Sequence, residues 1–251
     1  MESTLITDAL ARIGAFWDAD AATYDQATGH HPQTAIEWAA WRAALIRLLL
    51  PPPARILDVG AGTGFLSLAA AQLGYTVTAV DLSPAMLQRL TSKATAAGLL
   101  ITAVVARADE LPAGAWEAVI SRHLLWTLPD PLAALRCWRT ASPEGRLLLL
   151  ESLWGAVADP IERGRSQARD WLRRLRGIAH DHHAPYDDAI RSALPLGQGT
   201  TPERLIDLVG QAGWPASRIE RLTDIEWAMQ RQLPLPDRLL GVTPRFAVTA
   251  G

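Results

Sequence analysis

The sequence predicts an α/β fold in which helices cover both faces of a mostly parallel β-sheet. The chain has 251 residues, which suits one such domain with additions. Between residues 55 and 151, short apolar segments of strand length alternate with helix-like segments, as is typical of βαβ units. Most of the strand-like segments are apolar throughout, which is expected when both faces of a strand are buried.

The predicted elements follow in a regular order. Apolar side chains recur at helical spacing between residues 36 and 49, and the prolines at 51–53 end that helix. We predict strands at 55–59, 75–80, 100–106, 118–121 and 146–151, separated by helices at 65–73, 83–97 and 131–140. Beyond residue 153 the pattern predicts helices at 159–178 and 201–212, followed by strands at 219–227 and 245–250.

Composition excludes several classes of protein. Hydrophobic residues make up 49% of the chain and the formal net charge is −2, so no global attraction to nucleic acid is expected. A single cysteine excludes a disulfide framework within the chain and a multi-thiolate zinc site. No apolar run approaches the ~18 residues that span a membrane. Since the N-terminus also lacks the pattern of a signal peptide, we expect a cytoplasmic protein.

A glycine-rich turn joins the first predicted strand to the following helix. Gly60, Gly62 and Gly64 allow a sharp turn and a close approach of a ligand to the backbone. Asp58 precedes the turn, and Asp81 ends the next strand, where an acid can accept both ribose hydroxyls of a nucleotide. The turn alone is also compatible with a tight strand-to-helix connection that binds nothing.

The spacing distinguishes two nucleotide cofactors. A dinucleotide site usually has the spacing GxGxxG, because its pyrophosphate rests on the helix N-terminus. Here the spacing is GxGxG, and Asp58 would repel a pyrophosphate. The same carboxylate suits the positively charged methionine end of S-adenosylmethionine, which makes this cofactor the preferred prediction.

Several segments together carry a family resemblance. LDVGAGTGFLS, VDLSPAML, DELP and SRHLLWTLPDP resemble class I S-adenosylmethionine-dependent methyltransferases, and look closest to the ubiquinone/menaquinone-biosynthesis group. The resemblance covers about residues 20 to 151. It implies a Rossmann-like, seven-stranded, mostly parallel sheet with a reversed last hairpin. It also implies S-adenosyl-L-methionine as the cofactor.

With this resemblance, the chain is predicted to divide into four parts. Residues 1–50 form an N-terminal helical lid, and residues 51–153 form the cofactor-binding core. Residues 154–200 form a helical insertion after the fifth strand that caps the substrate. Residues 201–251 complete the core with its last helix and two strands.

The resemblance also implies the cofactor-binding residues. They follow the glycine turn and the ends of the next strands, and comprise Asp58, Gly60, Ala61, Gly62, Gly64, Asp81, Leu82, Met86, Ala108, Asp109, Arg122 and His123. One position departs from the family pattern, because Arg107 stands where the group usually has an acid. Either Asp109 makes the adenine contact, or the backbone around Ala108 makes it alone.

Candidate residues for the chemistry lie near the expected methyl group. His123 follows the fourth strand directly, a position that often lies near the methyl in relatives, so proximity is preferred to a role as base. Tyr24 resembles the tyrosine of a lid that closes over the cofactor, although a buried helical tyrosine is an equal alternative. His30 and His31 follow this motif, and a loop exposed to solvent is their alternative.

Candidate substrate contacts are less specific. They comprise Trp126, Glu151, Trp154, His180, His182, His183 and Tyr186. The histidine cluster could ligate a metal, but a polar loop is preferred and no metal is predicted. Ten tryptophans suit either ordinary helix packing or a flat aromatic substrate held between indoles.

We therefore predict methyl transfer to O, N, S or C of a small, cyclic or heteroaromatic metabolite. The alternatives are an NAD-dependent oxidoreductase and a non-catalytic protein that binds S-adenosylmethionine. A nucleic-acid methyltransferase is disfavoured, because SRHLLW is unlike the NPPY-type motif and no basic patch is evident. We expect a small-molecule acceptor as the partner, and neither nucleic acid nor a membrane. A homodimer is compatible with the sequence.

Overall fold

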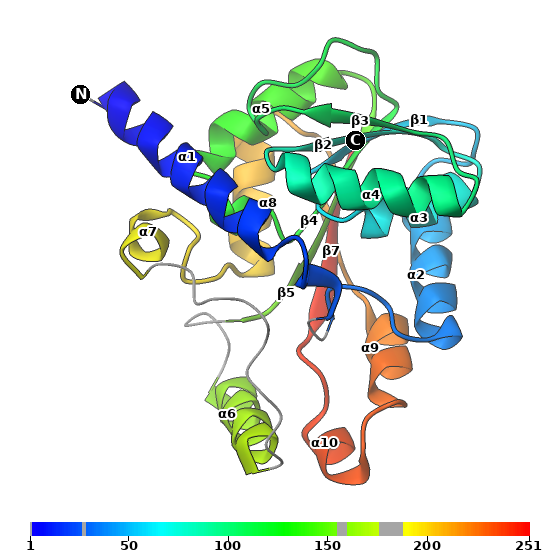
Figure 1. The fold of residues 1–251 in the computed structure, drawn as a ribbon, viewed down its shortest axis with the longest axis vertical. Coiled ribbons are helices and arrows are strands. Elements are labelled where there is room, and N and C mark those ends of the chain that lie inside the picture. The colour runs from blue at the N-terminus through cyan, green and yellow to red at the C-terminus, as the bar shows by residue number, and fades with distance from the viewer. Residues whose placement is uncertain (1, 27–28, 155–159, 176–187) are drawn as a thin grey trace.

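A seven-stranded sheet forms the centre of the molecule, with helices on both of its faces (Figure 1). The computed structural model describes residues 2–26, 29–154, 160–175 and 188–251. The strands are β1 (Arg55–Val59), β2 (Thr76–Asp81), β3 (Ile101–Val105), β4 (Ala118–Arg122), β5 (Arg146–Ser152), β6 (Arg218–Arg221) and β7 (Arg245–Ala250). Their order across the sheet is β3-β2-β1-β4-β5-β7-β6.

Only the last hairpin reverses the direction of the sheet. The pairs among β1, β2, β3, β4 and β5 are parallel, whereas β7 pairs antiparallel with both β5 and β6. The predicted mostly parallel, seven-stranded sheet with a reversed last hairpin is therefore confirmed. The carboxyl ends of β1, β2 and β4 lie together at one edge, which is where ligands bind in such sheets.

The helices form two layers around this sheet. In chain order they are α1 (Glu2–Asp20), α2 (Ala35–Leu48), α3 (Phe65–Gln72), α4 (Pro84–Ala96), α5 (Pro131–Ala141), α6 (Pro160–Leu175), α7 (Asp188–Ala193), α8 (Pro202–Gln211), α9 (Thr223–Gln230) and α10 (Leu235–Leu240), with short 3₁₀ turns η1 (Tyr24–Gln26) and η2 (Leu125–Thr127). One core joins the sheet to α2, α3 and α9, and a second joins it to α5 and α8.

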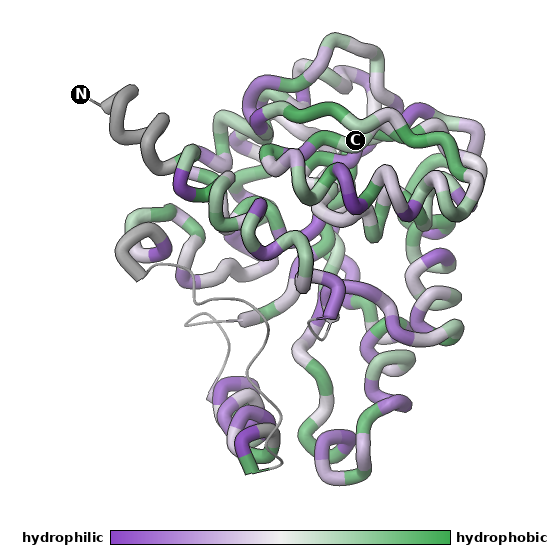
Figure 2. Tube along the Cα trace, viewed as in Figure 1, coloured by the Kyte–Doolittle hydropathy of each residue, from purple (hydrophilic) through white to green (hydrophobic). Residues whose placement is uncertain are grey.

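The alternation of side chains along β1 shows why its sequence is apolar throughout. Ile56 points into the first core and Leu57 into the second, and both are fully buried. In Figure 2 the central strands are correspondingly hydrophobic, whereas α6 is largely hydrophilic. The prediction of strands buried on both faces holds for the centre of the sheet. It is wrong for the edge strand β3, all of whose residues are exposed or half-buried, as are those of β6 at the other edge.

Side-chain caps define the starts of two helices. Ser83 accepts a hydrogen bond from the backbone N–H of Met86 at 3.1 Å, and Pro84 occupies the first turn of α4. The Asp130 carboxylate caps α5 in the same way, through the N–H of Ala133 at 2.8 Å. These local signals place the helices that frame the edge of the sheet.

The prediction of a strand at 219–227 is confirmed only as far as residue 221 and is wrong beyond it. The strand β6 ends at Arg221, and helix α9 follows. Leu222, Ile225 and Ala228 are all fully buried at a spacing of three residues, which is a helical rather than an alternating pattern. Asp224 stands in the first turn of the helix, where an acid is favourable. The short helix α10 was not predicted.

The segments outside the sheet have distinct positions. Helix α1 packs on α4. Helices α6 and α10 contact each other and project below the sheet in Figure 1. The described part of the predicted helix at 159–178 is helical from residue 160 to residue 175. The predicted division into lid, core, insertion and completion stays a prediction.

Candidate active site

The glycine turn between β1 and α3 has two kinds of glycine. Gly60 and Gly64 have φ of +71° and +90°, and a Cβ there would lie 2.8 Å from Leu124 and 2.5 Å from Leu90. These two glycines are therefore required by packing as well as by backbone conformation. Gly62 also has a positive φ, but a Cβ there would meet nothing closer than Tyr24 at 4.0 Å. Gly62 thus leaves its side of the turn open.

Asp81 ties the glycine turn to the end of β2. One carboxylate oxygen accepts the backbone N–H of Gly62 at 2.7 Å, and the other accepts that of Ser83 at 2.9 Å. Burial raises the pKa of Asp81, although the backbone N–H groups of Ser83 and Gly62 act to lower it. The carboxylate lines the main cavity and so presents an acceptor to a ligand.

Asp58 lies under the turn, at the end of β1. It is 1% exposed, and its Oδ2 accepts a hydrogen bond from the Ser67 hydroxyl at 2.6 Å. Burial, with a smaller contribution from the charge of Asp81, raises the pKa of Asp58 to about 7 against the lowering effect of the hydrogen bond from Ser67. A ligand with a positive charge at this point would stabilise the ionised form of Asp58.

Arg122 ends β4 and reaches the segment that follows η1. Its guanidinium donates to the carbonyls of Gly29 and His30, and stacks over the Phe65 ring at 4.8 Å. Burial lowers the pKa of Arg122. Its Nε is buried and has no hydrogen-bond partner among the described residues. Such an unsatisfied cationic donor is costly unless an anion binds to it.

Two cavities meet at Arg122. The main one has a volume of about 250 Å³, and the smaller one, about 30 Å³, lies beside the glycine turn. The main cavity is lined by most of the predicted cofactor residues: Gly60, Gly62, Asp81, Leu82, Met86, Ala108, Asp109, Arg122 and His123. The smaller cavity is lined by Asp58, Ala61, Gly60, Gly62 and Arg122. Gly64 faces Leu90 instead, so its role is in packing.

Helix α1 covers the main cavity with residues that were not among the predicted cofactor contacts. Leu10, Ile13 and Trp17 line it, together with Leu128 and Ala133 from the opposite side. These apolar side chains carry no chemical signature. The only sequence signal for them is the apolar spacing along the first helix.

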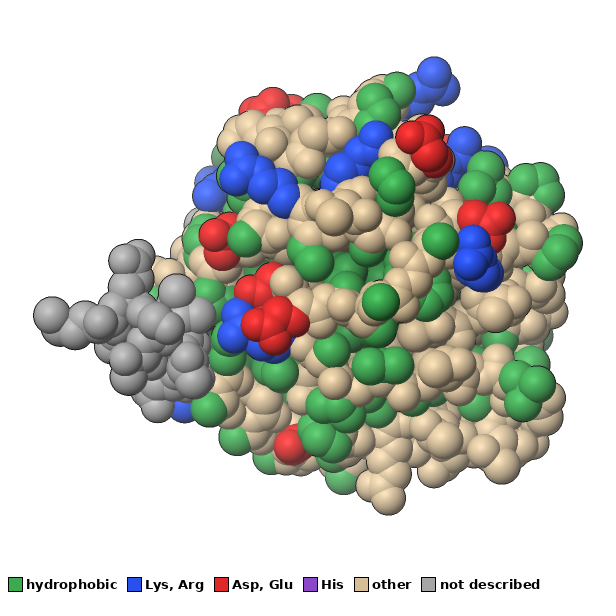
Figure 3. All heavy atoms as spheres, turned by 90° about the horizontal axis from the view of Figure 1, so that it is seen from above, with side chains coloured by type: hydrophobic (Ala, Val, Ile, Leu, Met, Phe, Trp, Pro, Cys, Tyr) green, Lys and Arg blue, Asp and Glu red, His purple; other side chains and the backbone are tan. Residues whose placement is uncertain are grey.

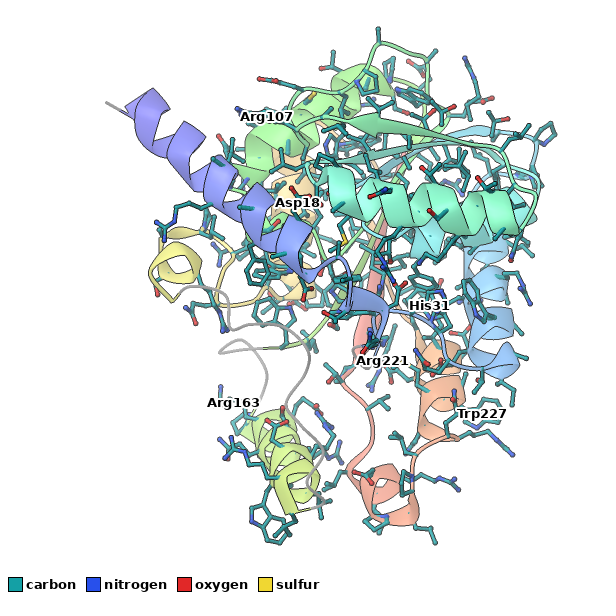
Figure 4. The ribbon with its side chains drawn as sticks, viewed as in Figure 1. Asp18, His31, Arg107, Arg163, Arg221 and Trp227 are labelled. Carbon is teal, nitrogen blue, oxygen red and sulfur yellow. The ribbon has the colours of Figure 1, made fainter. Side chains whose placement is uncertain are left out.

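Arg107, which stands where the family usually has an acid, lines the main cavity beside Asp109. The Arg107 guanidinium donates to both oxygens of Asp109, at 2.8 and 2.7 Å, which lowers the pKa of Asp109. The carbonyl of Ala108 accepts the indole N–H of Trp138 at 2.7 Å. Both candidate adenine contacts are thus held in place by neighbours. Figure 4 labels Arg107 at this end of the molecule.

Two acids fasten the N-terminal segment to the core. The Asp18 carboxylate accepts the Ser83 hydroxyl at 2.5 Å and the N–H of Ala85 at 3.1 Å, at the start of α4 (Figure 4). Asp25 pairs with Lys93 at 2.8 Å and accepts the Thr63 hydroxyl at 2.5 Å. Burial raises the pKa of Asp25, but the hydrogen bonds from Lys93 and Thr63 outweigh it and lower the pKa below its ordinary value.

Replacing Asp25 by asparagine is expected to loosen this segment, because the ion pair with Lys93 is lost. Amide hydrogen exchange should become faster in η1, and affinity for S-adenosylhomocysteine should fall by about threefold to tenfold. Calorimetry and exchange mass spectrometry measure the two effects. Glu117→Gln, which removes an exposed ion pair with Arg55, is the control. Unchanged exchange in the Asp25 variant would contradict the expectation.

The three candidate residues of the N-terminal segment, Tyr24, His30 and His31, have different surroundings in the structure. Tyr24 lines both cavities, and its ring lies 4.2 Å from that of His30. His30 lines the smaller cavity, and its Nδ1 lies 3.1 Å from the carbonyl of Tyr24. His31 packs on Trp38 instead, with ring centroids 5.0 Å apart. Of the two histidines, only His30 therefore lines a described cavity.

His123 and Glu151 form a pair at the edge of the sheet. The Nδ1 of His123 lies 3.1 Å from Oε2 of Glu151, and His123 lines the main cavity. His123 has φ +54°, a left-handed conformation that costs about 1–2 kcal/mol in a residue with a side chain. Glu151 is 5% exposed. The two residues follow directly after Arg122 and Leu150, which are paired across β4 and β5.

The two tryptophans among the candidate substrate contacts join a row of aromatic rings. Trp126 lies 6.4 Å from Trp17 and 5.3 Å from Trp154, measured between ring centroids. The Arg191 guanidinium lies over Trp154 at 5.4 Å. The row thus runs from the cavity wall toward α7. The remaining candidates, His180, His182, His183 and Tyr186, lie outside the described residues.

Comparison with known proteins places the chain in a family. Residues 33–194 match the family model described as a methyltransferase domain. The chain belongs to the methyltransferase domain family. The matched region of this methyltransferase contains β1 to β5 and the glycine turn. The prediction of an S-adenosylmethionine-dependent methyltransferase is confirmed, and the alternative of an NAD-dependent oxidoreductase is set aside.

Curated relatives share part of this methyltransferase. Ubiquinone biosynthesis O-methyltransferase of Xanthomonas campestris pv. campestris (strain B100) is 36% identical over 118 residues, which cover 45% of this chain and 47% of the relative. The protein of the same name from Xanthomonas axonopodis pv. citri (strain 306) is 37% identical over 105 residues, covering 40% and 44%. The chain therefore spans about half the length of the curated relatives it matches.

Solved structures confirm the fold of this methyltransferase. Phosphoethanolamine N-methyltransferase 2 of Haemonchus contortus, in complex with S-adenosyl-L-methionine, aligns with 93% of the chain and 56% of its own, at a TM-score of 0.59 and 16% identity. Magnesium protoporphyrin IX methyltransferase from Synechocystis PCC 6803, with bound SAH, aligns with 85% and 81%, at a TM-score of 0.53 and 17% identity. Among the described residues, no helix is both long and apolar enough to cross a membrane.

Proposed function

We propose that this methyltransferase transfers a methyl group from S-adenosylmethionine to a hydroxyl oxygen of a small cyclic acceptor. The observation that carries the proposal is the cavity of about 250 Å³ in which the glycine turn, Asp81 and His123 meet. When bound, the cofactor supplies a methyl group on a positively charged sulfur. The protein then has mainly to position the acceptor and exclude water.

The charges around the cavity fit the parts of the cofactor. Asp81 offers a carboxylate for the ribose hydroxyls, and Leu82 and Met86 offer apolar contacts for the adenine. The smaller cavity places Asp58 and Arg122 around one space, which suits an amino acid with its ammonium and its carboxylate. The unpartnered Nε of Arg122 would gain an acceptor from that carboxylate.

The acceptor is inferred from the walls next to His123. Trp17, Trp126 and Trp154 present indole rings in a row, which favours a flat, cyclic molecule. The relatives named O-methyltransferases support oxygen as the methylated atom. Transfer to N, S or C of such an acceptor is the alternative, and product analysis distinguishes it.

A small-molecule acceptor also suits the surface of the protein. On the face shown in Figure 3, Lys and Arg side chains are interspersed with Asp and Glu, so no broad positive patch faces the viewer. This favours a small acceptor over nucleic acid. The cytoplasmic location and the allowance for a homodimer stay predictions.

The proposed function is tested by binding and then by transfer. We expect S-adenosylhomocysteine to bind in isothermal titration. The fluorescence of NADH should stay unchanged when the protein is added. With labelled S-adenosylmethionine and 3,4-dihydroxybenzoate as the probe acceptor, a methylated product should form and carry the label on oxygen. No binding of either adenosyl ligand would overturn the proposal. Binding without transfer to any acceptor in a panel of phenols, amines, thiols and carbon nucleophiles would support the non-catalytic alternative.

A further inference from the structure

We propose that His123 and Glu151 act together as the proton acceptor for the hydroxyl that is methylated, with His123 as the catalytic base and Glu151 as its positioning residue. The inference rests on the proposed function and extends it to the fate of the acceptor's proton. A hydroxyl must lose its proton when it is methylated, and a general base lowers the barrier to this step. His123 is the imidazole that lines the main cavity.

The geometry favours a functional pair over a structural one. His123 stands at the carboxyl end of β4 in a left-handed conformation, with φ +54°. Strained backbone of this kind persists where the surrounding structure fixes it, and it clusters at active sites. His123 lines the main cavity and its side chain is 21% exposed, whereas that of Glu151 is 4% exposed. Glu151 thus contacts Nδ1 of the His123 ring, which leaves Nε2 for a ligand.

The surroundings determine how many protons the pair holds. Burial raises the pKa of Glu151 to about 8, against the lowering effect of Arg122. Burial also lowers the pKa of His123 well below 6.5, and the positive charges of Arg122, Arg245 and His30 lower it further. At neutral pH the pair is therefore uncharged, with Glu151 protonated and His123 neutral.

Loss of one proton converts the pair into a base. Glu151 then becomes a carboxylate that accepts the Nδ1–H of His123, which leaves a lone pair on Nε2. A positive charge in the cavity stabilises this negatively charged form of the pair. S-adenosylmethionine carries such a charge on sulfur, whereas S-adenosylhomocysteine does not. We therefore expect only the first ligand to drive a proton off the pair.

The proton balance of the transfer then closes. The hydroxyl proton moves to Nε2 of His123 while the oxygen lone pair bonds to the methyl carbon, and the electron pair of the broken carbon–sulfur bond stays on sulfur. The imidazolium that forms is offset by the Glu151 carboxylate at Nδ1. The pair then returns the proton to solvent before the next cycle.

The experiment counts protons and needs no acceptor. Isothermal titration at pH 7.5, in buffers of different ionisation enthalpy, measures the protons released when each adenosyl ligand binds. For the unmodified chain we expect S-adenosylmethionine to release at least about 0.3 proton more than S-adenosylhomocysteine. Glu151→Gln should abolish this difference. Glu162→Gln also removes a buried carboxylate, one that pairs with Arg169 on α6 at 2.5 Å, and should retain the difference.

Turnover provides the second readout. With 3,4-dihydroxybenzoate as acceptor, kcat/KM for S-adenosylmethionine, which reports the protein before the cofactor binds, should rise with pH and level off above about 8. This rise should disappear in Glu151→Gln. His123→Asn keeps a residue that tolerates the left-handed backbone, and should lower kcat by about 100-fold with a much smaller change in KM for the cofactor. Two results would overturn the proposed role of the pair. One is equal proton release for both ligands in the unmodified chain. The other is a difference in proton release that persists in both the Glu151 and the His123 variants. Failure of both ligands to bind would instead overturn the proposed function.

Discussion

Replacing Gly64 by alanine is expected to lower the free energy of unfolding by about 2–5 kcal/mol. The backbone there has φ +90°, which disfavours any residue with a Cβ. In addition, the new methyl group would lie 2.5 Å from Cγ and 3.1 Å from Cβ of Leu90. Leu90 is fully buried in α4, so it has little room to move. Urea denaturation followed by tryptophan fluorescence measures the loss.

The chain offers a matched control for this substitution. Gly98 also has a positive φ, +66°, but a Cβ there would meet nothing within 4 Å. Gly98→Ala should therefore show only the backbone cost of about 1–2 kcal/mol. Equal losses of stability in the two variants would contradict the role assigned to the contact between Gly64 and Leu90.

Replacing Asp81 by alanine is expected to weaken binding of S-adenosylhomocysteine by about 100-fold or more. Two hydrogen bonds to a charged carboxylate contribute about 1.5–3 kcal/mol each, and about 1.4 kcal/mol corresponds to a factor of ten. The carboxylate also accepts the N–H groups of Gly62 and Ser83, so its loss loosens the glycine turn. Isothermal titration measures the affinity, and circular dichroism checks that the fold is retained.

Two further variants define what the Asp81 result means. Asp81→Asn keeps one oxygen acceptor for the turn, so its affinity should fall between those of the unmodified chain and the alanine variant. Asp224→Ala removes an acid of α9 that pairs with Arg47 of α2, and it should leave the affinity unchanged. A folded Asp81→Ala protein that binds the ligand as tightly as the unmodified chain would contradict the assignment.

The sequence predicted those parts of the site that depend on neighbours along the chain. The glycine turn, Asp58 and Asp81 each occupy a fixed place at the end of an apolar strand, so their positions follow from local patterns. The contact between His123 and Glu151 instead depends on the register of β4 against β5, which no local pattern encodes. Both residues were singled out, but their contact was not.

The residues that cover the cavity could not be predicted from the sequence, for a different reason. Leu10 and Ile13 line the cavity through apolar contacts alone, and apolar side chains look the same whether they face a core or a ligand. The helix α9 was missed because Ile219–Trp227 mixes an alternating start with a helical end. Its burial at a spacing of three residues results from the packing of α9 on α2, a contact between segments far apart in the chain.

Arg122 has a consequence for turnover. Its guanidinium donates to the carbonyls of Gly29 and His30, and the residue also lines the smaller cavity, which is the space proposed for the cofactor's carboxylate. Ligand binding and closure of the N-terminal segment are then linked equilibria, and each must strengthen the other by the same factor. The thioether by-product keeps that carboxylate after the methyl group has left. Any gain in cofactor affinity from this linkage is therefore also a gain in the retention of the by-product.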